Sequence, residues 1–151
     1  QIGDIQIQTP TPLHVDIVFM MKNGECPSDE LIAAVDAAVK NSAKKSLNDY
    51  ITVNKPETVD YAINIKYYIN ESDRSKAAEI QKAVVEAVES YKQWQSEKIG
   101  RDISPWKLIY HIISTGAKRV EIISPTATTI AVGKVAKCTS QSVQYGGIED
   151  D

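Results

Sequence analysis

The clearest pattern in the chain is an unbroken alternation of apolar and polar positions from Val59 to Asn70. The apolar positions are Val59, Tyr61, Ile63, Ile65, Tyr67 and Ile69. A period of two predicts a β-strand with one buried face and one wet face. At about 3.3 Å per residue the strand would span roughly 40 Å, which is long for a strand.

Shorter apolar runs predict further strands. Residues 1–12 contain Thr9-Pro10-Thr11-Pro12, and the repeated Thr-Pro favours an extended linker or the end of an upstream domain. Apolar composition and turn residues then predict strands over 15–21, 50–53, 120–123, 130–138 and 143–145. Gly133 interrupts the alternation in the fourth of these and is interpreted as a bulge.

Two helices are expected from residues that recur at helical spacing. Ser28 is suited to cap the first, whose narrow, Ala-rich apolar face requires a packing partner that comes close. That face consists of Leu31, Ala34, Val35, Ala38, Val39 and Ser42. The second helix is expected over about 75–98 and ends before Gly100, a residue suited to the position after a helix. Its apolar stripe consists of Ile80, Ala83, Val84, Ala87, Val88, Tyr91 and Trp94.

A third, shorter helix is expected between Ser104 and Gly116, with Ser104 as N-cap and Pro105 in the first turn. Its apolar residues do not keep to one side. One face consists of Trp106, Ile109, Tyr110 and Ile113, and we expect it, like Trp94, to be buried. Leu108 and Ile112 point elsewhere, which predicts a helix buried on two sides.

The order of these elements predicts an α+β fold. Its first part resembles a split β-α-β lobe with a mixed or antiparallel sheet and helices on one face, followed by a short helix and C-terminal strands. We divide the chain into residues 1–12, a β-α-β-β segment over 13–70, and a region over 71–151 that packs with the first as one C-terminal unit.

Composition adds limits to this picture. The 151 residues carry a formal net charge of −3, so no overall basic field favours nucleic acid or an anionic membrane. No apolar run reaches the roughly 18 residues of a membrane span, and we expect no signal peptide. Cys26 and Cys138 are expected to be free thiols in a reducing compartment. Because the chain begins at Gln1, we interpret it as a fragment or processed piece.

Candidate chemistry is sparse. His14 and His111 have no metal-ligand spacing around them, and the glycines form no phosphate-binding loop. The segment Gly100-Arg101-Asp102 could place an arginine beside an anion, but we favour a structural corner between two helices. The acidic residues of the second helix suit a solvated face. We therefore expect no catalytic residue, no metal and no cofactor, although sequence alone leaves a pair of catalytic carboxylates open.

Several segments, in order, resemble the baseplate J family. They are NGECPSDELIAAVDAAV (23–39), SLNDYITVNKPETVDYAINIKYYI (46–69), GRDISPWKLIYHIISTGAKRVEIISP (100–125) and VQYGGIED (143–150). The third is similar to the family's Gly-Arg-Asp-Ile-x-Pro helix and the Gly-x-x-Arg-Val strand after it. Lys44-Lys45-Ser46 departs from the family, which often has Arg-Pro there. Because family members usually carry a further N-terminal region, the chain resembles their C-terminal part.

The resemblance implies a structural role. Baseplate J-like proteins are wedge components of phage-type contractile tails, and related parts occur in tailocins and other injection machines. It implies partners that are further copies of the chain and other baseplate proteins, without nucleic acid or membrane. It also implies assembly in the bacterial cytoplasm followed by residence in the tail baseplate. The family is not known for catalysis, so the resemblance transfers no active site.

A protein that works by contact needs apolar surface for its partners. The candidates from sequence are Leu108, Ile112 and Tyr68, the last on the wet face of the long strand. The alternatives are burial within the domain for Leu108 and Ile112, and an ordinary exposed aromatic for Tyr68. A different function, a small-molecule-binding regulatory α+β domain, would require a polar-lined pocket between the sheet and a loop.

Overall fold

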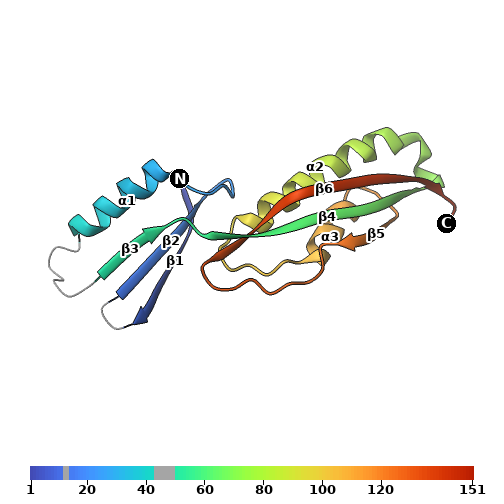
Figure 1. The fold of residues 1–151 in the computed structure, drawn as a ribbon. Helices are drawn as coiled ribbons and strands as arrows, with labels where there is room; N and C mark the ends of the chain where they lie inside the picture. Colours follow the sequence, from blue (N-terminus) through green and yellow to red (C-terminus); the bar gives the residue numbers. More distant parts are fainter. Residues whose placement is uncertain (12–13, 43–49) are drawn as a thin grey trace.

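The computed structural model describes residues 1–11, 14–42 and 50–151, so the departure at Lys44-Lys45-Ser46 lies outside the described residues. It contains two three-stranded mixed sheets with helices, which confirms the α+β class. In Figure 1 the first sheet with helix α1 lies to the left, and the second sheet with helices α2 and α3 extends to the right toward the C-terminus. The molecule is elongated along the long strand β4.

The first sheet has the order β1-β2-β3. Strand β1 (Ile2–Thr11) is antiparallel to β2 (His14–Met21), and β3 (Tyr50–Asn54) is parallel to β2. Helix α1 (Asp29–Ser42) connects the parallel pair, so β2, α1 and β3 form the expected β-α-β unit. The residues interpreted as an extended linker are therefore a paired strand over 2–11. Extended backbone was correctly expected there, but pairing across a sheet depends on residues far away in sequence.

Helix α1 begins as expected, because the Ser28 hydroxyl accepts a hydrogen bond from the Leu31 amide (3.2 Å). Its packing differs from the expectation. Leu31, Val35 and Val39 are only half-buried, and Ala34 and Ala38 are exposed. The helix lies against β3 at the surface of the molecule. The expectation that the alanines pack closely against a partner element is therefore wrong, because Ala34 and Ala38 are exposed.

The second sheet has the order β5-β4-β6. Strand β4 (Glu57–Asn70) is its centre, and its residues from Tyr61 onward alternate strictly between buried and half-buried, which confirms the predicted alternation. Strand β5 (Arg119–Ser124) is antiparallel to β4 and β6 (Lys134–Glu149) is parallel to it. The two short strands expected over 130–138 and 143–145 are one continuous strand, and Gly133 is a turn residue before it (φ 81°) rather than a bulge.

The helices cover one face of the second sheet. A 3-10 turn η1 (Glu71–Lys76) leads into α2 (Ala77–Ser96), and α3 (Pro105–Ile113) follows after a short corner. The main core lies between these helices and the inward residues of β4. Its members include Tyr61, Ile63, Ile65, Tyr67, Ile69, Ile80, Val84, Val88, Tyr91, Leu108 and Ile112.

The two sheets are joined by polar and apolar contacts. The Asp4 carboxylate accepts from the Ile99 amide (2.7 Å). The Gln6 side chain donates to the Ile99 carbonyl (2.9 Å) and accepts from the Gly133 amide (2.8 Å). Met20 packs with Ile99 and Val135. Along the chain, the boundary between the two sheets falls between β3 and β4, whereas the sequence suggested a division at residue 70. How the chain divides into folding units stays a prediction.

Candidate protein-docking surface

The position of α3 is set by the buried side chain of Gln95 on α2, which is 0% exposed. Its amide group donates to the backbone carbonyls of Arg101 (3.2 Å) and Asp102 (3.0 Å). Its oxygen accepts from the Tyr91 hydroxyl (2.9 Å) and from the Ser104 amide (3.2 Å). A buried amide with its polar groups paired in this way fixes the path of the backbone around it.

The Gly100-Arg101-Asp102 segment forms the structural corner that we favoured. Helix α2 ends at Ser96 with Glu97 as C-cap, so Gly100 is not the residue directly after the helix; with a φ of 79° it lies in the turn that follows. The Arg101 guanidinium lies 4.0 Å from the centre of the Trp94 ring and donates to the Trp94 carbonyl. The Asp102 carboxylate accepts from the Ile130 amide (2.8 Å). These groups hold the turn between the helices, and the Ser104 hydroxyl then caps α3 by accepting from the Lys107 amide (3.3 Å).

The two faces of α3 lie the opposite way round from the sequence expectation. Leu108 and Ile112 are 0% exposed and belong to the core. Trp106 is 68% exposed, Tyr110 63% and Ile113 39%. The expectation that Trp106 is buried is therefore wrong. Of the two possibilities given for Leu108 and Ile112, partner contact and burial within the domain, the structure shows burial. A fully buried side chain has no surface to offer to a partner.

We call the exposed apolar face of α3, formed by Trp106, Tyr110 and Ile113, the α3 surface. The spacing of these residues, i, i+4 and i+7, places them on one side of the helix. Sequence reasoning found this face but assigned it to the interior, because it holds more apolar residues than the face with Leu108 and Ile112. The helical pattern defines two faces, but it does not say which one meets the sheet.

A cation borders the α3 surface. The Lys107 ammonium lies 5.3 Å from the centre of the Tyr110 ring and 5.1 Å from that of Trp94. Within the described residues it forms no ion pair with a carboxylate. Burial and the nearby Lys107 charge lower the pKa of His111, so this side chain is neutral beside the surface at physiological pH. The edge of the α3 surface thus combines exposed aromatic rings with one positive charge.

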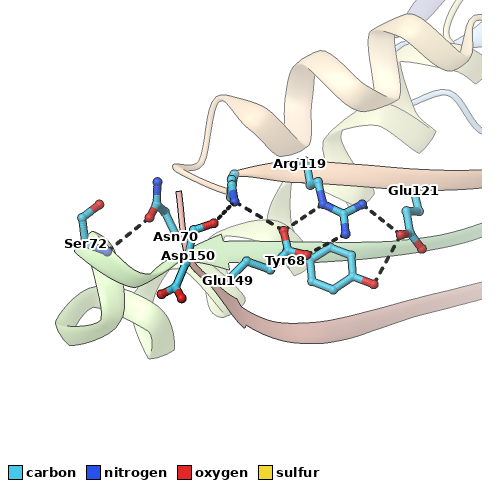
Figure 2. Close-up of polar contacts among 8 residues, drawn as sticks. Tyr68, Asn70, Ser72, Arg119, Glu121, Glu149 and Asp150 are labelled. Atoms are coloured by element: carbon cyan, nitrogen blue, oxygen red, sulfur yellow. Dashed lines mark hydrogen bonds and ion pairs between the residues drawn. The ribbon is translucent and has the colours of Figure 1, made fainter.

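Tyr68 lies elsewhere, on the sheet face opposite the helices, and Figure 2 shows its ring beside Arg119 and Glu121. The Arg119 guanidinium sits 4.0 Å from the ring centre. From the neighbouring strand β6, Gly146 lies so close that a Cβ there would be 2.4 Å from a ring carbon. Its hydroxyl lies 3.4 Å from a carboxylate oxygen of Glu121. Tyr68 is therefore half-buried and structurally engaged, and a contact with a partner stays a prediction for it.

Arg119 links the three strands of the second sheet. It makes two hydrogen bonds to Glu149 of β6 (2.8 and 2.7 Å) and one to Glu121 of β5 (2.9 Å), beside Tyr68 of β4. The Glu149 and then the Glu121 hydrogen bonds raise the pKa of Arg119, and the Arg119 hydrogen bond lowers the pKa of both carboxyls. All of these charges are paired with one another, which suits a structural clamp.

Other candidates for chemistry are engaged within the protein. His14 pairs with Asp16 (2.9 Å). In the described part of the chain no group of three or more His, Cys, Asp or Glu side chains could hold a metal ion, and no described helix is long and apolar enough to cross a membrane. Cys26 and Cys138 are free thiols. A hollow of about 440 Å³ is lined by Lys92 and Lys137, but both already donate to protein oxygens.

These features define an α+β protein that exposes an aromatic surface on a helix whose start is fixed by buried hydrogen bonds. A family model described as the baseplate J-like protein C-terminal domain matches residues 61–144, more than half of the chain. The chain belongs to this family, which indicates a structural role in a phage tail baseplate. The matched segment includes α2, α3, β5 and most of β4 and β6. No curated protein matches the chain.

Proposed function

We propose that the chain is a wedge-type structural component of a contractile-tail baseplate, acting through self-association and through contacts with other baseplate proteins. It does so without catalysis or cofactor. Assembly takes place in the bacterial cytoplasm, and the finished part resides in the baseplate of a virion or a related injection particle such as a tailocin.

The observation that carries this proposal is the α3 surface. Large aromatic residues dominate the binding energy of protein interfaces, and Trp and Tyr are the side chains most enriched there. Trp106 and Tyr110 are more than three-fifths exposed on a helix whose other face is fully buried. Leaving such rings in water forgoes the gain from apolar burial, which a partner would supply.

The α3 surface also has the support that an interface requires. The Gln95 hydrogen bonds and the Ser104 cap fix the start of α3 before any partner arrives. A preorganised surface loses little conformational freedom on binding. Lys107 at its border favours a partner that places a carboxylate next to apolar side chains. We propose another baseplate protein with this chemistry as the occupant, with Tyr68 as a candidate for a second, separate contact.

The test is incorporation into particles. The gene of the chain is replaced in its own genome by one that encodes an epitope-tagged double variant, Trp106→Glu with Tyr110→Glu. Immunoblotting for the tag then measures how much of the variant is present in purified particles. Because both side chains are exposed, the variant should keep its fold, as circular dichroism would show, and yet be lost from particles. The matched control is Val132→Glu, since Val132 is also 68% exposed but lies outside α3.

The control variant should enter particles like the wild type. Incorporation of the folded double variant at the wild-type level would refute the α3 surface as the docking site. Absence of the wild-type chain itself from all particles would refute the baseplate role.

A further inference from the structure

Among the strands of residues 1–11, 14–42 and 50–151, strand β6 is an edge of the second sheet and pairs only with β4. Edge strands usually carry charges or prolines that prevent pairing with other chains. From Cys138 to Ile148 the chain has no charged residue and no proline. The opposite edge is guarded differently: β5 is six residues long, carries Arg119 and Glu121, and ends before Pro125. The β6 edge is therefore open to a further strand.

The open part of this edge is regular. The pairing of β4 with β6 shifts at Thr139 and again at Gly146-Gly147, and between these shifts Ser140–Tyr145 pairs with β4 without interruption. A strand needs only a few regular residues to extend a sheet, and main-chain hydrogen bonds supply the affinity in such additions. We call the segment Ser140–Tyr145 the β6 edge.

Charges at the two ends of β6 favour one occupant. The strand starts with Lys134 and Lys137 and ends with Glu149, which Asp150 and Asp151 follow. If two copies pair antiparallel, the basic start of each strand comes beside the acidic end of the other. A parallel arrangement would bring like charges together, which is unfavourable. The uncharged middle allows the segment to lie against itself without repulsion.

Apolar groups lie along the same edge. Tyr145 is 37% exposed, and Val143 packs only partly against the core. On α2, Lys92 donates to Gln141 of β6 (2.9 Å), so this flank of the helix faces the β6 edge. Val85, two helical turns before Lys92, lies on the same flank and is 57% exposed. A second copy would cover these apolar side chains as well as the open backbone groups.

We propose that the β6 edge pairs antiparallel with the β6 edge of a second copy of this chain, with Val143 near the two-fold axis. The two sheets would then form one continuous sheet, in the order β5-β4-β6 followed by β6-β4-β5. This names the surface for the self-association in the proposed function and rests on it in that respect. It leaves the α3 surface free for a different partner.

The test uses complementary charges on the isolated chain, Gln1–Asp151. Ser142 and Gln144 are changed together to Glu in one variant and together to Lys in another. In the proposed register Ser142 of one copy lies opposite Gln144 of the other, so each variant opposes like charges. Sedimentation velocity should show dimers for the wild type, monomers for each variant alone, and dimers again for an equimolar mixture of the two variants.

Three results would overturn the inference: a wild-type chain that stays monomeric up to about 1 mM, a Glu variant that still dimerises, or a mixture of folded variants that stays monomeric. Should either double variant unfold, Gln144→Glu and Gln144→Lys replace them, since Gln144 is exposed. The two substituted side chains then lie diagonally across the two-fold axis, where like charges still repel. The Trp106→Glu, Tyr110→Glu variant should dimerise like the wild type. Failure of the β6 pairing and failure of the α3 docking are therefore distinguishable.

Discussion

At the scale of single residues, Tyr68 shows how a position on a wet strand face acquires a specific environment. Its ring packs against the Arg119 guanidinium and close to the bare Cα of Gly146, on two other strands. The sequence predicted the face on which Tyr68 lies, because alternation is local. It could not predict these contacts, because the partners come from strands about fifty and almost eighty residues further along the chain.

A substitution pair tests this packing. Gly146→Ala should lower the free energy of unfolding by about 1–3 kcal/mol, because its Cβ would overlap the Tyr68 ring. Gly147→Ala should cost about 1–2 kcal/mol for another reason, its φ of +111°, since nothing lies within 4 Å of its Cβ. Adding Tyr68→Ser should recover stability in the first variant and not in the second. Urea denaturation measures both, and equal effects of Tyr68→Ser in the two backgrounds would contradict the packing.

His111 predicts a pH effect on stability. Burial, with a smaller effect of Lys107, lowers its pKa in the folded protein below the ordinary 6.5, so the unfolded chain binds the proton more readily. The neutral His111 side chain therefore contributes its full share to the stability of the fold above pH 6.5, and this share is lost as the pH falls through the pKa of the folded protein. Between about pH 7 and about pH 5, the wild type should lose more stability than His111→Phe. Parallel pH profiles from thermal denaturation would contradict this.

At the scale of elements, the sequence predicted the helix N-caps and the hydrophobic periodicity of helices and strands. It did not predict how these elements pair or which face they bury. Ser28 and Ser104 cap helices as expected, because a cap involves residues three apart. Strand β1 was expected as a linker, since its pairing with β2 depends on the whole sheet. Strand β6 was expected as two pieces, because Ser and Gln positions interrupt its apolar alternation, while its continuity comes from pairing with β4.

Helix α3 provides the element-scale prediction. Leu108→Ala should lower the free energy of unfolding by about 2–5 kcal/mol, because it leaves a cavity in the core. Trp106→Ala should change it by less than about 1 kcal/mol, because most of the ring is already in water. Denaturant unfolding of the two variants gives the comparison. A larger loss for Trp106→Ala would mean that α3 packs by its other face and that the α3 surface does not exist.

At the scale of the whole molecule, the two sheets are tied by Asp4, Gln6 and Met20 of the first to Ile99, Gly133 and Val135 of the second. Asp4 and Gln6 of β1 make the hydrogen bonds between the sheets. The sequence analysis could not predict these contacts, because it interpreted residues 1–12 as a linker or the end of an upstream domain. The result is an elongated molecule (Figure 1) in which helix α3 packs beside the second sheet and β6 lies at one edge of that sheet. The two proposed contacts, through the α3 surface and through the β6 edge, would let one subunit join another protein and a second copy at once.

The claim that the chain works by docking through α3 is tested most directly in assembled particles. Lysine-reactive cross-linking followed by mass spectrometry should link Lys107, which borders Tyr110, to a different baseplate protein. That link should disappear when Trp106 and Tyr110 are changed to Glu. Particles that contain the chain but link Lys107 only to residues of the same chain would contradict the account.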